Sequence, residues 1–159
     1  GDKIRELTLD ELLKRTTPFL IKDGVITGTP EELEVVKCAL PIIQERIATL
    51  AEVSQMLKFL FVSKFEVDAE ELPKIKDEQA QAVLKKSNDV LQKLEKWDHE
   101  SIHVALKSAL IEELGLKPRV AFGAVRIAVT GSHISPPLFE SMELLGRTRS
   151  LERIAGSIS

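Results

Sequence analysis

Three short stretches of this chain repeat one helix-start signal, in which a threonine precedes a glutamate by three positions. They are Thr8–Glu11, Thr29–Glu32 and Thr49–Glu52. At this spacing the hydroxyl accepts the amide of the third helical residue, and the glutamate reaches back to the amide of the threonine. Pro30 adds a proline at the first helical position, where its missing N–H costs nothing. A chain that starts helices so regularly is expected to be built from helices.

Apolar residues recur at helical spacing after these signals and throughout the second half of the chain. Pro41 is expected to kink or split the second helix. Residues 63–77 lose the pattern and contain Pro73, which indicates a connection, with one short turn at 68–72. The expected helices lie near residues 9–15, 30–46, 50–62, 78–96, 98–114, 118–130, 136–145 and 148–156.

The predicted fold is therefore all-α, with two small helical subdomains at residues 1–66 and 67–159 packed into one elongated unit. The chain has 159 residues, which is enough to bury a core. Charges interrupt every apolar run before it could span a membrane. Cys38 is the single cysteine and cannot form an internal disulfide, so we expect a buried or partly buried thiol in the cytoplasm.

Charge is distributed unevenly along the chain. Residues 117–159 carry six basic and three acidic side chains, whereas residues 1–116 carry 16 basic and 22 acidic ones. A basic end on an acidic body can bind phosphate locally, although ordinary charge scatter explains the pattern equally well.

The sequence His99-Glu-Ser-Ile-His103 matches the pattern of zinc peptidases, in which two histidines one helical turn apart hold the metal. Such a site needs a third ligand, and the only other histidine is His133, so we expect surface positions and no metal site. Paired carboxylates such as Glu70–Glu71 are likewise interpreted as surface charges. The chain has no glycine-rich phosphate loop and no nucleophile elbow.

The last third holds the most specific motif of the chain. An arginine lies in an apolar run that ends at Thr130-Gly131, followed by Ser135-Pro-Pro-Leu-Phe139 and Leu144-Leu-Gly-Arg147. This series resembles the C-terminal, anticodon-holding end of bacterial-type class I glutamyl-tRNA synthetases. The match is specific over residues 117–154 and looser over 40–52 and at Trp97.

The resemblance implies a helix across Val125–Thr130, although β-branched residues at this density favour a strand on their own. It also implies anticodon contacts for Arg126 and a helix start at Ser135, Pro136 and Leu138 that packs under splayed-out bases. Thr130 belongs to the same matched motif. Arginine suits this role because its planar fork of donors fits base edges and phosphates.

Arg46 is a second candidate, because an arginine near this point reads the third anticodon base in the enzymes that the chain resembles. The alternative is a solvated arginine that pairs with Glu45 or Glu52. Arg147, Arg149 and Arg153 are interpreted as either phosphate contacts or helix-surface charges. The six phenylalanines are expected to fill mostly core positions, which gives little support for a general single-strand binder.

Taken with the resemblance, the expected function is recognition of glutamate tRNA by part of a glutamate–tRNA ligase, acting as a cytoplasmic monomer without DNA or membrane partners. The parent enzyme would use ATP and magnesium. Both ATP-gripping motifs of class I synthetases are missing from this sequence, so we expect a non-catalytic fragment without a cofactor. A helical protein-interaction module that kept the fold without RNA binding is the alternative.

Overall fold

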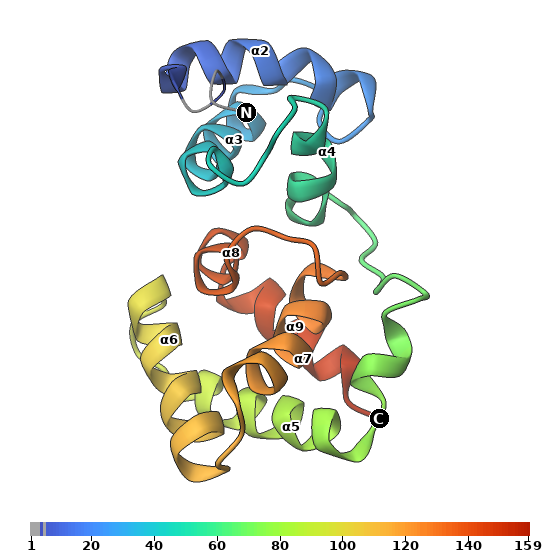
Figure 1. The fold of residues 1–159 in the computed structure, drawn as a ribbon, viewed down its shortest axis with the longest axis vertical. Helices are drawn as coiled ribbons and strands as arrows, with labels where there is room; N and C mark the ends of the chain where they lie inside the picture. Colours follow the sequence, from blue (N-terminus) through green and yellow to red (C-terminus); the bar gives the residue numbers. More distant parts are fainter. Residues whose placement is uncertain (1–3, 5) are drawn as a thin grey trace. The chain divides into compact units, whose positions relative to one another are not determined.

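The computed structural model describes residue 4 and residues 6–159. The chain divides into two compact units. Unit 1 runs as far as Lys64 and also includes Ile134–Pro137, and unit 2 consists of Phe65–His133 and Leu138–Ser159. All regular secondary structure in the described residues is helical, which confirms the predicted fold class (Figure 1). The boundary after residue 66 stays a prediction for the folding domains.

Unit 1 contains α2 (Leu9–Lys22), α3 (Pro30–Ile43), α4 (Glu52–Leu57) and the 3-10 turn η1 (Lys58–Leu60). The first two threonine signals start helices as predicted, with Thr8 accepting the amide of Glu11 and Thr29 forming a complete capping box with Glu32. One carboxylate oxygen of Glu32 accepts the amides of Thr27, Gly28 and Thr29 at 3.0, 2.9 and 2.9 Å. These bonds, led by the one from Thr29, lower the pKa of the Glu32 carboxyl to about 2.

Other expectations for unit 1 were wrong in detail. The third threonine signal starts no helix at residue 50, because α4 begins at Glu52 and has no side-chain cap. Glu52 instead accepts the amide of Ala48 at 2.6 Å, within the turn that precedes α4. α2 continues through Pro18 to Lys22 and is longer than predicted. Cys38 is exposed and not buried.

Unit 2 follows the predicted order of helices closely. Its elements are η2 (Leu72–Ile75), α5 (Glu78–Gln92), α6 (His99–Leu106), η3 (Lys107–Glu113), α7 (Pro118–Thr130), α8 (Leu138–Leu145) and α9 (Arg147–Ser157). The β-branched end of α7 is helical, as the resemblance implies, and Val125, Ile127 and Val129 are buried there within the packing of unit 2. The expected helix over 98–114 changes from α to π geometry at Lys107.

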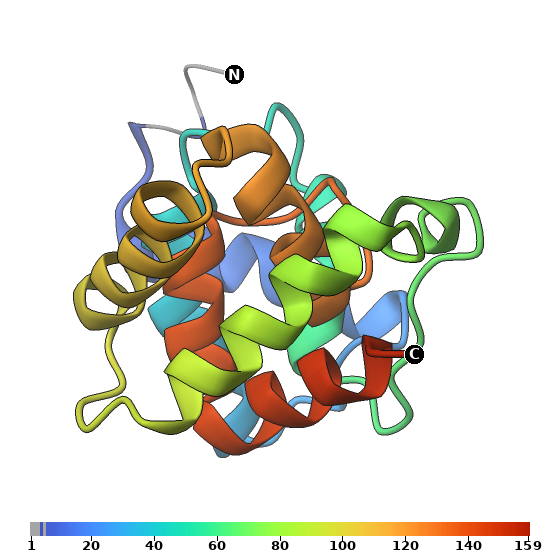
Figure 2. The same cartoon turned by 90° about the horizontal axis from the view of Figure 1, so that it is seen from below.

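α7 forms the centre of unit 2. Its inner face is buried and consists mainly of small and β-branched residues, namely Ala121, Ala124, Val125, Ala128 and Val129. Small side chains let neighbouring helices approach closely. α5 packs against both α7 and α9, and it runs across unit 2 in the view from below (Figures 1 and 2).

Gln81 on α5 ties three segments of unit 2 together. Its amide nitrogen lies 2.6 Å from the carbonyl of Ile75 and 3.0 Å from that of Ser157. Its amide oxygen accepts the backbone N–H of Ser159 at 2.8 Å. A buried amide with all of these partners satisfies its own polar atoms and joins η2 to the end of α9.

Candidate nucleic-acid interface

The outer side of α7 forms a basic and aromatic stripe, which we call the α7 stripe and define as Arg119, Phe122, Gly123 and Arg126. These positions fall on one face of the helix, since neighbours on a helix surface are three and four residues apart. Arg119 is exposed, and the other three residues are partly exposed. No atom lies within 4 Å of the point where a Cβ of Gly123 would stand. The stripe therefore has a bare stretch of backbone between two arginines.

An aromatic cluster adjoins this stripe and joins α6, α7 and α8. The ring of His103 lies nearly parallel to the ring of Phe139, at 4.4 Å and 13°. Phe122 meets Phe139 edge-on at 5.1 Å and 87°. His103 is exposed, and the two phenylalanines are half-buried. The cluster thus offers aromatic surface at the edge of the unit as well as packing within it.

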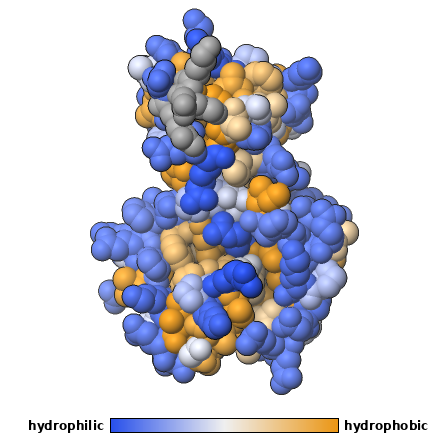
Figure 3. Space-filling model, viewed as in Figure 1, coloured by the Kyte–Doolittle hydropathy of each residue, from blue (hydrophilic) through white to orange (hydrophobic). Residues whose placement is uncertain are grey.

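Apolar surface is exposed around the same helices. Val104 on α6 is 62% exposed and Val120 on α7 is 38% exposed. Figure 3 shows apolar surface lying open among hydrophilic side chains on one face of unit 2. Of the six phenylalanines, all of which the structure describes, Phe59 alone is buried, so the expectation that they mostly fill the core was wrong.

Thr130 and Gly131 end α7. The Thr130 side chain is buried, with its hydroxyl 2.7 Å from the carbonyl of Arg126 and 2.9 Å from that of Ser132. Gly131 adopts a left-handed conformation, with φ of 88°, and its amide bonds to Ile127. A side chain at this position is strained, and its Cβ would stand 3.2 Å from the carbonyl oxygen of Glu66. Thr130 and Gly131 shape the end of the helix that carries Arg126.

The predicted helix start at residues 135–138 is placed two residues too early. α8 begins at Leu138, whose side chain is 2% exposed. Ser135 and Pro136 precede the helix, and the Ser135 hydroxyl donates to the carbonyl of Pro136 at 3.1 Å. Two consecutive prolines lack amide hydrogens and cannot supply the freed N–H groups of a helix start. Any such groups belong to Leu138 and the residues after it.

Arg147 lies at the start of α9 and reaches the end of α5. Its guanidinium nitrogens lie 3.4 Å from the carbonyl of Leu91 and 3.3 Å from that of Glu95. The same group lies 5.2 Å from the centre of the Trp97 ring. A cation at the carbonyl end of a helix is a stabilising arrangement. The described contacts of Arg147 are therefore structural.

The other two arginines of α9 are also engaged within unit 2. Arg149 donates to the carbonyl of Leu145 at 3.0 Å, and burial lowers the pKa of its guanidinium. Arg153 is 8% exposed and donates to the carbonyl of Val129 at 2.9 Å. Burial, with the nearby charge of Arg149, lowers the pKa of Arg153 to about 10. The interpretation of Arg153 as a phosphate contact or a surface charge was wrong.

Arg46 lies in unit 1, in the turn after α3, and its side chain is exposed. Its amide bonds to Ile43 at 2.8 Å. Neither of the two expected partners pairs with it among the described residues, since Glu52 accepts backbone amides instead. The structure thus places Arg126, Thr130 and Leu138 in unit 2, and Arg46, Ser135 and Pro136 in unit 1.

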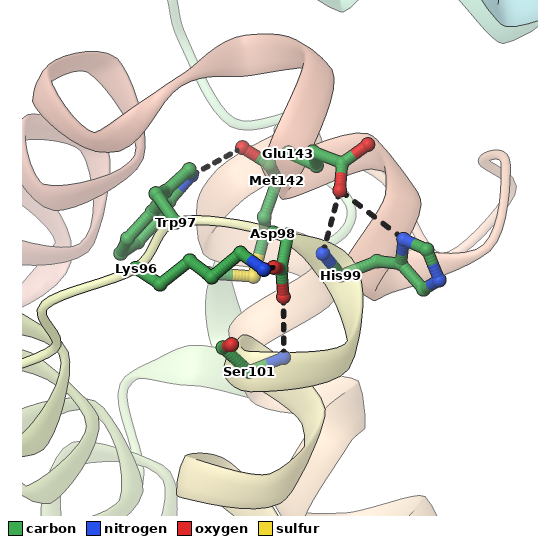
Figure 4. A network of polar contacts seen from close by, with 7 residues as sticks. All are labelled: Lys96, Trp97, Asp98, His99, Ser101, Met142 and Glu143. Carbon is green, nitrogen blue, oxygen red and sulfur yellow. Dashed lines mark hydrogen bonds and ion pairs between the residues drawn. The ribbon is translucent and has the colours of Figure 1, made fainter.

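The zinc-like histidine motif serves a different purpose. Asp98 caps α6 by accepting the amide of Ser101 at 2.7 Å, and Glu143 of α8 accepts the amide of His99 at 2.8 Å (Figure 4). Glu143 also lies 3.1 Å from the His99 ring, which raises the pKa of that imidazole. His103, the second histidine of the motif, stacks on Phe139. The two histidines therefore join α6 to α8.

No group of three or more histidine, cysteine, aspartate or glutamate side chains that could hold a metal ion occurs among residues 4 and 6–159. None of the helices described is long and apolar enough to cross a membrane.

Reasoning from the sequence missed Phe122, Phe139, His103 and Gly123. The signal was present, because Arg119, Phe122 and Arg126 recur at helical spacing within α7. Glu71 was also misjudged, since it was interpreted as a surface charge and is 2% exposed. Its burial depends on a residue far along the chain, which no local pattern reveals.

Comparison with known proteins places this helical fold in a family. The family model of the anticodon binding domain matches residues 11–158. The chain therefore belongs to the anticodon-binding domain family.

Its relatives include longer proteins named glutamate–tRNA ligases. It is 42% identical over 159 residues to the glutamate–tRNA ligase of Nocardioides sp., with 98% of this chain covered. It is 44% identical over 158 residues to that of Acidothermus cellulolyticus, with 97% covered. The chain spans 32% and 31% of these two proteins, about a third of their length.

Solved structures share the fold at greater distance. A glutamate tRNA ligase from Elizabethkingia meningosepticum, solved in complex with its amino acid, superposes with a TM-score of 0.76 at 16% identity. The likeness covers 99% of this chain and 30% of that one. The same helical architecture therefore persists at low sequence identity.

Proposed function

We propose that this chain recognises the anticodon of glutamate tRNA, and that the α7 stripe makes the main contacts in unit 2. The observation that carries the proposal is the stripe itself, in which Arg119 and Arg126 flank the bare backbone at Gly123. Membership of the anticodon-binding domain family and the glutamate–tRNA ligase relatives support it.

The chemistry of this surface suits single-stranded RNA. Bases in an RNA loop are unstacked and available, so proteins read them by stacking and by hydrogen bonds to their edges. The open spot at Gly123 lets a base approach the helix closely, with the Phe122 ring beside it. Arg126 supplies a planar fork of donors for a base edge, and Arg119 adds positive charge for the phosphates.

The remaining predicted residues take supporting roles in this proposal. Thr130 holds the end of α7 through its buried hydroxyl, and Leu138 begins α8, which carries Phe139. Ser135 and Pro136, which belong to unit 1, lie in the connection between these helices and are proposed as further contacts with the anticodon. Arg46, exposed in unit 1, reads a further anticodon base. Arg147 and Arg149 stabilise unit 2 through their bonds to backbone carbonyls and make no phosphate contact in this proposal.

The parent protein is proposed to be a monomeric cytoplasmic glutamate–tRNA ligase that joins glutamate to its tRNA with ATP and magnesium. Neither ATP-gripping motif occurs in this sequence. Those ligands are therefore assigned outside these 159 residues, and this part contributes the choice of tRNA and not the chemistry.

Substitutions at Gly123 test the proposal most directly. Replacement by leucine places a side chain in the open spot and should weaken binding of glutamate tRNA. The fold should be kept or slightly stabilised, because glycine within a helix costs about 1 kcal/mol relative to alanine. Gly123→Ala is the matched control, since it improves the helix with a much smaller obstruction. If Gly123→Leu and Gly123→Ala both bind glutamate tRNA with wild-type affinity, the proposed site is contradicted.

Arg126→Ala tests the reading of the base. We expect a loss of about 1–3 kcal/mol of discrimination between glutamate tRNA and anticodon-substituted tRNA. Affinity is measured by filter binding with the full-length protein. Arg15→Ala, at an exposed position of α2, is the control. Unchanged discrimination in Arg126→Ala would remove the base-reading role. A wild-type protein that binds no tRNA would favour the protein-interaction alternative.

A further inference from the structure

Glu71 is an unusual residue for the start of a 3-10 turn, because its carboxylate side chain is 3% exposed. Burying a carboxylate without partners is costly, so each of its oxygens is expected to have one. One oxygen bonds to Nδ1 of His133, and the other lies 3.3 Å from the ammonium group of Lys74. The side chains of both partners are largely exposed, with an exposed fraction of 60% for His133 and 55% for Lys74. The carboxylate thus lies beneath an exposed imidazole ring and an exposed ammonium group.

The two partners of Glu71 differ in what they connect. Lys74 is three residues away, in η2, so its ion pair joins the segment to itself. His133 is 62 residues away, in the connection between α7 and α8. Of these two contacts, only the bond to His133 joins Glu71 to the residues that follow α7.

A second contact between the same two segments lies close by. The amide of Asp68 donates to the carbonyl of Gly131 at 3.0 Å, and the amide of Glu71 in turn bonds to the carbonyl of Asp68 at 2.9 Å. The Phe65 ring lies 3.4 Å from the Cβ position of Gly131 and 3.9 Å from the Arg153 guanidinium. Residues 65–71 therefore hold the end of α7 by backbone and aromatic contacts. Glu71 extends this hold two residues further, to His133.

We infer that Glu71 is a positioning residue for anticodon recognition, which holds His133 and thereby fixes the chain directly after the helix that carries Arg126 and Thr130. The inference rests on the proposed function. Glu71 does not touch RNA in this arrangement, because its side chain is almost wholly buried. It acts through His133, two residues before Ser135.

The physical basis is the strength and geometry of a charge-assisted hydrogen bond. Burial alone raises the pKa of the Glu71 carboxyl, but the bond to His133 and the proximity of Lys74 outweigh it and lower that pKa. The carboxylate is therefore ionised at neutral pH, and a bond to it is stronger than one between neutral groups. A bond of this kind restricts a connection that has no regular secondary structure.

Four variants of the protein as encoded separate positioning from plain stability. Glu71→Ala removes the anchor, and His133→Ala removes the anchored ring. His133→Asn keeps a side-chain amide near the place of Nδ1 and should retain the bond. Lys74→Ala removes the local ion pair and leaves the connection to His133 intact. Thermal unfolding of each variant sets an assay temperature at which all of them are folded.

Glu71→Ala and His133→Ala should each weaken affinity for glutamate tRNA about tenfold, the size expected for one charge-assisted hydrogen bond. Discrimination against anticodon-substituted tRNA should fall with it, while charging at saturating tRNA changes less than twofold. The double variant should bind about as weakly as either single one, because both remove the same interaction. His133→Asn and Lys74→Ala should bind nearly as wild type.

Three results would overturn the inference. Wild-type affinity in Glu71→Ala would mean that His133 acts without its anchor. Equal losses of affinity in Glu71→Ala and Lys74→Ala would mean that Glu71 only stabilises the fold. If the loss of tRNA affinity in the double variant equals the product of the two single losses, the two residues act independently. A wild-type protein that ignores the anticodon overturns the proposed function itself, which distinguishes that failure from these.

Discussion

α7 and α9 are neighbours in unit 2 and both carry arginines, but they use them differently. The arginines of α9 donate to backbone carbonyls, Arg147 to the end of α5, Arg149 to Leu145 and Arg153 to Val129. Arg119 of α7 is exposed and Arg126 is partly exposed, on a stripe that borders an aromatic cluster. Charge counted along a sequence therefore overstates the charge that a ligand meets. Part of the positive charge in the last third of this chain is used in hydrogen bonds within unit 2.

Arg153 should give the largest effect on stability. Replacement by leucine keeps bulk beside Phe65 but leaves the buried carbonyl of Val129 without this donor, which we expect to lower the free energy of unfolding by about 2–4 kcal/mol. Anticodon preference should stay as in wild type at temperatures where the variant is folded. Urea unfolding and tRNA binding measure the two quantities. Altered preference without loss of stability would reverse the assignment of α9.

Arg147 should give a smaller effect of the same kind. Its two hydrogen bonds are long, and its contact with Trp97 is a cation–π interaction on a partly exposed side chain. We expect Arg147→Ala to cost about 1 kcal/mol of stability, because surface interactions of this type are weak. Arg147→Lys is the control, since it keeps the charge but not the planar fork. If tRNA affinity falls in proportion to the lost charge, α9 faces RNA after all.

The sequence is a good guide to these helices and a poor guide to their arginines. The caps at Thr8 and Thr29 depend on residues within one turn, so their spacing alone predicts where α2 and α3 begin. Thr49 has the same spacing, and Glu52 accepts its amide at 3.4 Å, but the Thr49 side chain caps no helix and α4 begins only at Glu52. Arg153 and Glu71 find their partners 24 and 62 residues away. Such partners are set by packing, which one sequence read locally does not contain.

Arg119 sharpens the comparison through salt dependence. Each arginine that contacts phosphate of single-stranded RNA adds about −0.7 to the slope of log affinity against log salt concentration. Arg119→Ala should therefore make the slope shallower by about 0.7, whereas Arg149→Ala should leave it nearly unchanged. Binding titrations over a series of salt concentrations measure both slopes. Equal changes in the two variants would erase the distinction between α7 and α9.

The smallest predicted effect concerns the His99 imidazole, which loses its positive charge when it is deprotonated. Glu143 raises the pKa of His99 above its ordinary value of 6.5. The pair therefore stabilises unit 2 fully below that ordinary pKa, and the contribution is lost as pH rises through the raised folded value. Melting temperatures from about pH 5.5 to 8.5 should fall more in wild type than in His99→Asn. Glu143→Gln should remove the difference, and parallel curves for all three proteins would contradict the pairing.

The bridge made by Gln81 also bears on how the protein comes to be folded during synthesis. Gln81 on α5 cannot donate to the carbonyl of Ser157 until the chain has been synthesised 76 residues further. Until α9 has been made, α5 and α7 lack the helix that packs on both of them, and their apolar faces stay accessible. If translation pauses between α7 and α9, unit 2 is therefore incomplete and the apolar faces of α5 and α7 are exposed to solvent. Unit 2 closes late, at its last helix, and is at its most vulnerable to aggregation just before that helix arrives.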